Sequence, residues 1–162
     1  MAWLKFFGLA YVALAIQTAF LPVVFPDWLR PSALIILANV YLLGKPDEWT
    51  VLRVWMIGLL GDMTSLSPAG SQAFVFGLYA LLIITIRPVL FTETPFAHAV
   101  TAVTGVIVIS ALYLILSKLV ANVPMLPYSV VEVIGQALMT AVIAALTAKL
   151  FTTARRPSMA RR

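Results

Sequence analysis

Residues 97–120 read AHAVTAVTGVIVISALYLILSKLV, an apolar run in which Lys118 is the only residue among Asp, Glu, Lys and Arg. A helix that crosses a membrane needs about 20 mostly apolar residues, because the hydrocarbon core is roughly 30 Å thick and each residue advances a helix by about 1.5 Å. The run is therefore long enough to cross a membrane as one helix.

The rest of the chain has the same apolar character. Of its 162 residues, 62% are hydrophobic and 10% are charged, and the mean hydropathy is +1.04, whereas soluble domains carry about 25% charged residues. A soluble fold of this length could not bury so much apolar surface. The composition therefore predicts an all-α, polytopic membrane protein with one domain.

Charge and cysteine content exclude several functions. The net charge of +5 comes from basic residues that cluster at span ends and in the C-terminal tail, so it does not indicate nucleic-acid binding. The chain has no cysteine, which excludes disulfides, thiolate metal sites and thiol catalysis.

Proline, glycine and charged residues divide the chain into six predicted spans. We place them at residues 6–24, 31–44, 50–63, 71–86, 97–120 and 128–151, in a transmembrane domain of residues 1–152 that precedes a basic tail, 153–162. Pro31 would occupy the first helical position of the second span, and Pro88–Phe96 would form a loop or an interfacial segment. The second and third spans are short, so their ends either extend into the loops or are buried among other helices. Five complete spans are the alternative.

A cleaved signal peptide is a less favoured interpretation of the first span. Ala13-Leu14-Ala15 resembles a cleavage site with small residues, but the apolar run continues to Val24. A signal peptide normally ceases to be apolar at its cleavage site, so we expect the segment to be retained as a span.

The basic residues predict the orientation. With the N-terminus inside and six spans, nine of the eleven Lys and Arg residues fall on the cytoplasmic side and two fall outside. This asymmetry is typical of cytoplasmic loops, and it supports an even number of spans with both termini cytoplasmic. The nine are Lys5, Lys45, Arg53, Arg87, Lys149, Arg155, Arg156, Arg161 and Arg162, and the two are Arg30 and Lys118.

Few polar side chains lie within the spans. Asp62, near the outer end of the third span, would brace the following loop or bind a partner, because acids within membranes are usually functional; interfacial water at a helix end and a proton or cation site are the alternatives. Glu132 is favoured by the helix dipole in the first turn of the sixth span, or it forms a polar patch with Gln136. We expect His98 to be interfacial, because one histidine without neighbouring ligands does not make a metal site.

Small residues at four-residue spacing mark helix–helix contacts, because they let helices approach closely in lipid. The small residues are Ala73 and Gly77 in the fourth span, Ala97, Thr101 and Gly105 in the fifth, and Ala137, Ala141, Ala144, Ala145 and Ala148 in the sixth.

No nucleophilic triad, pair of catalytic carboxylates, phosphate-binding loop or zinc motif is present in the sequence. We therefore predict neither an enzyme nor a metal or cofactor site.

Two stretches stand together in the sequence. They are Leu29–Tyr41, LRPSALIILANVY, and Gly58–Gly70, GLLGDMTSLSPAG, the latter with a Gly-x-x-x-Asp pattern before a small polar loop and a glycine. Together they resemble the bacterial rod shape-determining protein MreD family. Leu66 departs from the pattern, since family members often have glycine there. Length, basic tail and six-span layout extend the resemblance along nearly the whole chain. The residues that it marks as a structural or partner-binding motif are Arg30, Pro31, Gly58, Asp62, Ser65, Gly70 and Gln72.

The resemblance implies a non-enzymatic partner of MreC, a single-span protein, in the bacterial cytoplasmic (inner) membrane. It implies a role in cell elongation, lateral peptidoglycan synthesis and rod shape, with indirect partners in a RodA-type glycosyltransferase, a class B penicillin-binding protein and the actin-like MreB. No cofactor is expected, and homo-oligomerisation is left open. The family is also similar in fold to the six-helix substrate-binding components of energy-coupling-factor transporters.

That similarity supplies the main alternative, a component that binds a vitamin-like small molecule. Its cavity would be lined by the few polar side chains within the spans, which are Asn39, Asp62, Gln72, Glu132 and Gln136. A lipid enzyme is a third interpretation, and it would require Asp62 and Glu132 to meet near the outer face.

Overall fold

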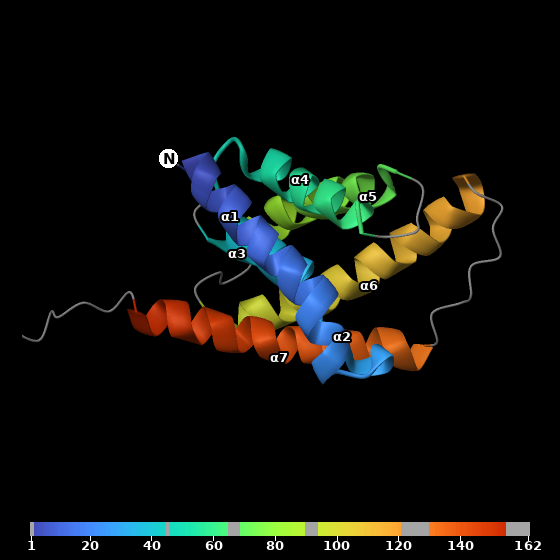
Figure 1. Ribbon diagram of the computed structural model, residues 1–162. Helices are drawn as coiled ribbons and strands as arrows, with labels where there is room; N and C mark the ends of the chain where they lie inside the picture. Colours follow the sequence, from blue (N-terminus) through green and yellow to red (C-terminus); the bar gives the residue numbers. More distant parts are fainter. Residues whose placement is uncertain (1, 45, 65–68, 90–93, 121–129, 155–162) are drawn as a thin grey trace, which may run out of the picture.

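The computed structural model describes residues 2–44, 46–64, 69–89, 94–120 and 130–154, and these residues form helices joined by short connections (Figure 1). The helices are α1 (Ala2–Ala15), the π-helical turn η1 (Ile16–Phe20), α2 (Leu21–Val24), the 3-10 turn η2 (Asp27–Leu29), α3 (Ala33–Leu43), α4 (Thr50–Asp62), α5 (Ser71–Ile86), the 3-10 turn η3 (Arg87–Val89), α6 (Pro95–Val120) and α7 (Val130–Ala154). The prediction of an all-α fold is confirmed.

Three helical stretches are long and apolar enough to cross a membrane. They are Trp3–Val24, Pro95–Leu116 and Val130–Lys149. The helices α3, α4 and α5 have 11, 13 and 16 residues, which is about 16, 20 and 24 Å at 1.5 Å per residue. The second to fourth predicted spans therefore correspond to helices shorter than the hydrocarbon core, and six complete spans remain a prediction.

Several helix ends differ from the predicted ones. Pro31 is not the first residue of α3, because Ser32 has an extended backbone and caps the helix by accepting the N–H of Ile35. The helix α6 begins at Pro95, within the segment expected to be a loop, since proline is well suited to a first helical turn. The helix α7 continues to Ala154, into the predicted tail.

The short helix α3 occupies the centre of the bundle and contacts α1, α4, α5, α6 and α7. Its first backbone N–H groups have no partners within the helix, and the hydrocarbon core offers no water to replace them. Side chains of other helices supply acceptors instead. The Gln17 Oε1 atom of η1 accepts the Ala33 N–H at 2.7 Å, and the Thr140 Oγ1 atom of α7 accepts the Ser32 N–H at 3.0 Å. A helix end buried among other helices thus explains the shortness of the second span.

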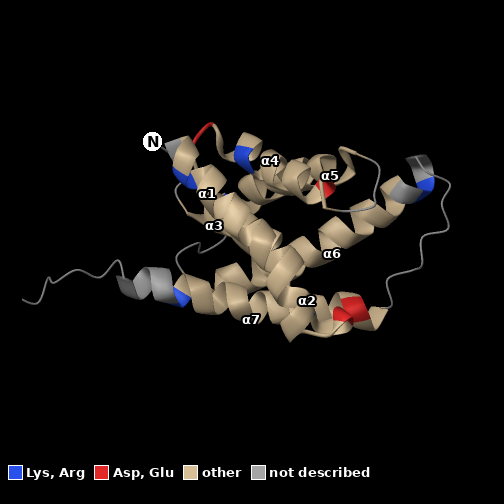
Figure 2. Ribbon diagram, viewed as in Figure 1, with Lys and Arg blue, Asp and Glu red and all other residues tan. Residues whose placement is uncertain are grey.

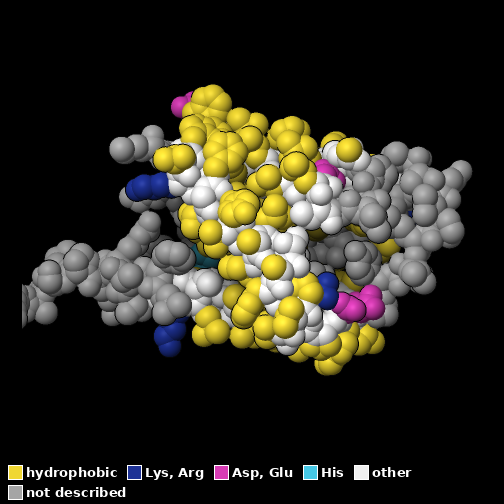
Figure 3. All heavy atoms as spheres, viewed as in Figure 1, with side chains coloured by type: hydrophobic (Ala, Val, Ile, Leu, Met, Phe, Trp, Pro, Cys, Tyr) yellow, Lys and Arg dark blue, Asp and Glu magenta, His cyan; other side chains and the backbone are white. Residues whose placement is uncertain are grey.

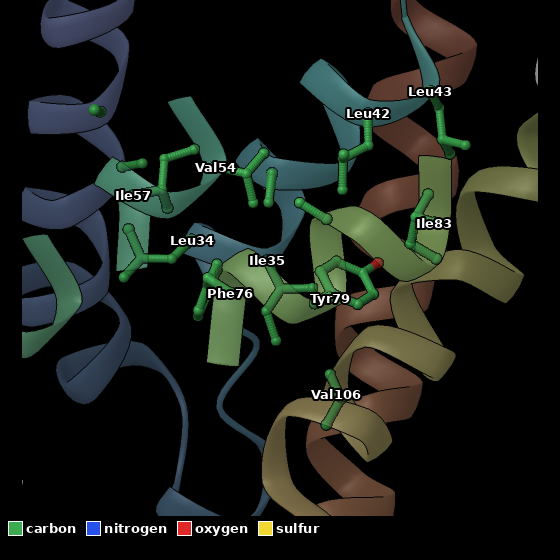
Figure 4. Packing of buried hydrophobic residues seen from close by; sticks show 14 of the residues in the cluster. Leu34, Ile35, Leu42, Leu43, Val54, Ile57, Phe76, Tyr79, Ile83 and Val106 are labelled. Carbon is green, nitrogen blue, oxygen red and sulfur yellow. The ribbon is translucent and has the colours of Figure 1, made fainter. Parts of the chain in front are cut away.

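The apolar core surrounds α3. Figure 4 shows side chains from α3, α4, α5 and α6 that point toward one another, and Tyr79 is the largest side chain that is fully buried. The labelled core residues are Leu34, Ile35, Leu42, Leu43, Val54, Ile57, Phe76, Tyr79, Ile83 and Val106.

The outer surface is also apolar. Only 11% of the 18-residue window in Trp3–Val24 is buried, and α7 exposes large hydrophobic side chains along one face, such as Ile134, Leu138 and Val142. The face that Figure 3 displays, over α1 and α2, is largely hydrophobic. Soluble proteins rarely expose an apolar surface of this extent to water, whereas such a surface is favourable in contact with lipid.

The small residues pack between helices, as close approach requires. Ala73, Ala97, Thr101 and Ala137 are all buried, and the pairs α4–α5 and α6–α7 are the most extensively packed. These small residues therefore serve contacts within the chain.

Both ends of the described chain lie on the same side of the bundle. The N-terminus and the C-terminal end of α7 are at the same side of Figure 1. Charged residues gather toward the ends of the helices, and the middle of each long helix is free of them (Figure 2).

Candidate functional site

The antiparallel pair α4–α5 carries most of the predicted motif, and glycine makes its close packing possible. A Cβ atom on Gly58 would lie 2.6 Å from the carbonyl oxygen of Gln72 and 2.8 Å from the Cα atom of Ala73. Real side chains do not approach backbone so closely, so a larger residue at position 58 would force the helices apart. Gly61 is less constrained, because its Cβ would meet the end of the flexible Gln72 side chain, which can move aside.

Asp62, the last residue of α4, caps the start of α5. Its Oδ1 atom accepts the backbone N–H of Gln72 at 2.9 Å, and its Oδ2 atom accepts the N–H of Ala73 at 3.0 Å. The carboxylate is buried and lies at the positive end of the α5 dipole, where a negative charge is favoured. Gly70, the N-cap residue, has a φ of +89° that L-residues rarely adopt. Asp62 thus replaces the side-chain cap that glycine lacks.

This geometry gives Asp62 a structural task. Both carboxylate oxygens serve orphan N–H groups of a helix that begins within the protein, and a side chain from a neighbouring helix is well placed to satisfy them. A proton or cation carrier would need those oxygens for its cargo. Ser65, the remaining predicted residue of this loop, lies outside the described residues.

Arg30 and Pro31 lie elsewhere, in the segment that leads into α3. Arg30 forms an ion pair with Asp27 of η2, and Pro31 is buried. The turn η2 packs against α7, where the carbonyl of Trp28 is so close to Gly135 that a Cβ there would collide with it. The two halves of the predicted motif therefore meet different helices.

A second group of polar residues lies at the centre of the bundle. The Tyr79 hydroxyl of α5 donates toward Asn39 Oδ1 of α3 at 2.6 Å and toward the Thr101 carbonyl of α6 at 2.9 Å. Gly105 leaves the space for this hydroxyl, because its Cβ would lie 2.8 Å from the Tyr79 oxygen. One side chain thus joins three helices.

Asn39, Tyr79 and Thr101 together form a buried triad, of which the Asn39 amide is the third member. Its Nδ2 atom is buried without a hydrogen-bond partner among the described residues. If the amide is turned over, Nδ2 donates to the Tyr79 oxygen and Tyr79 donates to Thr101. The Tyr79 hydroxyl and one of the two Nδ2 N–H groups of Asn39 then each have an acceptor, as burial in an apolar core favours.

A third group lies where α3 leads into α4. The Thr50 hydroxyl donates to Asp47 Oδ1 at 2.9 Å, and the buried guanidinium of Arg53 lies 2.9 Å from Asp47 Oδ2. The hydrogen bond from Thr50 and the charge of Arg53 hold the pKa of the Asp47 carboxyl below its usual range. Arg53 also lies 5.2 Å from the ring of Trp3 and 5.8 Å from that of Tyr41, so it ties α4 to α1 and α3 through cation–π contacts.

Sequence reasoning missed Gln17, Tyr79 and Arg53 as organising residues. Asp47, Thr50 and Arg53 recur at three-residue intervals, which is a local signal for a capping and ion-pair cluster. Gln17 and Tyr79 have no such signal, because their partners are remote in sequence.

The polar groups required by the alternative functions do not converge on one site in the described part of the chain. Asn39 bonds to Tyr79, Asp62 caps α5, and Glu132 and Gln136 lie on α7. The helix α7 packs chiefly on α6, α3 and η2. In the described part of the chain, the five groups proposed to line a cavity therefore fall into three sets: Asn39 with Tyr79, Asp62 with Gln72, and Glu132 with Gln136.

These features define a class: a polytopic helical membrane protein whose buried polar side chains hold its short central helices. Residues 1–153 match the model of a protein family described as rod shape-determining protein MreD, and the chain belongs to that family. The suspected family is confirmed, and with it a role in determining rod shape. No match was found among curated proteins or among solved structures.

Proposed function

We propose that this protein is a non-enzymatic scaffold of the cell-elongation machinery in the bacterial cytoplasmic membrane, with both termini in the cytoplasm. It binds MreC and so helps to regulate lateral peptidoglycan synthesis. The RodA-type glycosyltransferase, the class B penicillin-binding protein and MreB are its indirect partners. Family membership over residues 1–153 supports this function.

The observation that carries the proposal is the use of the buried polar side chains. Asp62 caps α5, Tyr79 joins α3 to α6, and Gln17 and Thr140 cap α3. Each bond stabilises the arrangement of helices, as a scaffold needs. A carrier or an enzyme would instead direct polar groups toward a substrate.

A single-span partner fits the apolar outer surface. The stretch Trp3–Val24, which begins in α1, is the least covered of the three long ones, with 11% of its most apolar window buried, against 22% for α6 and 28% for α7. In lipid, helices associate through van der Waals contact rather than through the hydrophobic effect. The partner's span would therefore recognise the shape of the bundle, and correct packing of the bundle would be a condition of binding.

Co-purification with MreC in a mild detergent tests the proposal. The wild-type protein should capture MreC, and Asp62→Ala should capture less because it loosens the pair α4–α5. Thr18→Val is the matched control, since the Thr18 hydroxyl is exposed and bonds to the Leu14 carbonyl of its own helix. Failure of both the wild type and the control to capture MreC would refute the proposal.

The same material tests the small-molecule alternative. Ligand binding to the folded state stabilises it by RT ln(1 + c/Kd), where c is the free ligand concentration, so the unfolding temperature rises with ligand concentration. A thermal shift with a vitamin-like compound, together with no capture of MreC, would favour a transport component.

A further inference from the structure

The helix α5 is joined to its neighbours at three depths. At its start, Gln72 and Ala73 donate to Asp62 of α4; in its middle, Tyr79 bonds to α3 and α6. Just after its end, Arg87 donates to the Gly44 carbonyl at the C-cap of α3, at 2.8 Å. At about 1.5 Å per residue, the three levels are roughly 10 and 12 Å apart. The single helix α5 therefore links the cap at Asp62 of α4 to the C-terminal end of α3 at Gly44.

Asp62 helps to set the position of α5 along α4. Gly58 and Gly61 of α4 have no side chains to interlock with those of α5, and the ring of Trp55 on α4 lies against Gly77 of α5, which has no side chain either. Close contact alone would allow the helices to slide or rotate. The two hydrogen bonds from Asp62, at 2.9 and 3.0 Å, fix the register.

The bonds of α5 tolerate little displacement. A hydrogen bond is lost when donor and acceptor separate beyond about 3.5 Å, so the bond of 2.6 Å between Tyr79 and Asn39 allows a shift of less than ~1 Å. A shift of α5 by the rise of one residue, about 1.5 Å, exceeds this tolerance. The carboxylate of Asp62 and the ring of Tyr79 are too short and too rigid to follow such a movement.

We propose that α5 moves as one rigid helix and thereby couples the cap at Asp62 of α4 to the C-terminal end of α3 at Gly44. In one state, the cap, the Tyr79 triad and the contact between Arg87 and Gly44 are formed together. In the other state, loss of the cap shifts α5, and the Gly44 end of α3 loosens. The coupling is a property of this chain and does not depend on which partner it binds.

The two ends of α3 should respond differently. Gln17 and Thr140 hold its N-terminal end through bonds that do not involve α5. Its middle and C-terminal end depend on α5 through Asn39 and Gly44. Release of α5 therefore frees the Gly44 end first.

A single cysteine can report this movement, because the chain has none of its own. Leu43 is 3% exposed and lies next to Gly44, so Leu43→Cys should react slowly with a maleimide when the protein is in nanodiscs. Asp62→Ala should raise the labelling rate at least about fivefold, the lower range of allosteric coupling. Asp62→Asn, a milder change, should raise the rate less and keeps the test possible if the alanine variant does not fold.

Two further variants distinguish coupled movement of α5 from a general loss of stability. Tyr79→Phe breaks the middle connection, so Asp62→Ala should add little to its effect. Thr140→Ala removes a bond at the other end of α3, and it should leave labelling unchanged at a comparable loss of thermal stability. The proposal is overturned if Asp62→Ala leaves the labelling rate unchanged, or if Thr140→Ala raises it equally. It is also overturned if the fold-increases in labelling rate caused by Asp62→Ala and Tyr79→Phe multiply in the double variant, as independent effects do.

Discussion

The hydroxyl oxygen of Tyr79 lies 2.6 Å from Oδ1 of Asn39, and this bond joins α5 to the central helix α3 inside a core that excludes water. Neither side chain is exposed by more than 1%. A polar pair in such a place must be satisfied by protein groups, which makes it sensitive to substitution of either partner alone.

Tyr79→Phe should lower the free energy of unfolding by about 1–3 kcal/mol, because it leaves the buried Asn39 amide without its partner. Tyr79→Phe combined with Asn39→Leu should recover part of this loss, since two apolar partners have no unmet hydrogen bonds. Unfolding in mixed micelles, followed by circular dichroism, measures both. Tyr11→Phe is the control, because Tyr11 is exposed; equal losses for Tyr11→Phe and Tyr79→Phe would contradict the role of the buried bond.

Asp62→Ala should destabilise the protein by about 0.5–2 kcal/mol, the usual cost of losing an N-terminal helix cap. Amide hydrogen exchange gives a local test, since the N–H groups of Gln72 and Ala73 should exchange faster than those in the middle of α5. Uniformly faster exchange along the whole chain would indicate that the effect is global, contrary to a capping role.

Gly58→Ala and Gly8→Ala should have opposite effects. A Cβ atom at position 58 would meet the backbone of α5, whereas one at position 8 would have no atom within 4 Å. Overpacking typically costs about 1–3 kcal/mol, and alanine in place of an unconstrained helical glycine gains about 0.5–1 kcal/mol. Thermal unfolding of both variants checks this prediction, and similar shifts for the two would exclude close packing of α4 on α5.

The Asp47 carboxyl should make stability depend on pH in acid. Its pKa in the folded protein is lowered, first by the hydrogen bond from Thr50 and then by Arg53, so its contribution is present above the unfolded pKa of about 4 and is lost as the pH falls further. Wild type and Asp47→Asn should therefore converge in stability below about pH 4. Carboxyl carbon NMR should also show a higher Asp47 pKa in Thr50→Val, and no change in Thr147→Val, whose hydroxyl bonds within α7. An unchanged pKa in Thr50→Val would contradict the assigned cause.

Most helix positions could be predicted, because local chemistry sets helix ends. The predicted fourth span, 71–86, coincides with α5, since Gly70 permits a left-handed turn before it and Arg87-Pro88 ends it. The first span was predicted only as an apolar run. Its π-helical turn, Ile16–Phe20, contains Gln17, whose bond to Ala33 of α3 no local pattern reveals.

The candidate site was predictable only where its chemistry is unusual for a membrane. Asp62 stands out because a carboxylate within a span is costly, but its partners on α5 follow from the hairpin geometry. Tyr79 resembles any aromatic residue in a span until Asn39 and Thr101 are placed beside it. Arg53 was counted among the nine cytoplasmic basic residues, and its burial against Trp3 and Tyr41 depends on the packing of α1 against α4.

Native mass spectrometry of the protein released from membranes together with MreC tests the scaffold function most directly. We predict a complex of the wild-type chain with MreC that survives in mild detergent, and a reduced fraction of complex for Asp62→Ala, while Thr18→Val behaves as the wild type. A wild-type chain that carries no MreC, but retains a bound small molecule, would contradict the proposed function.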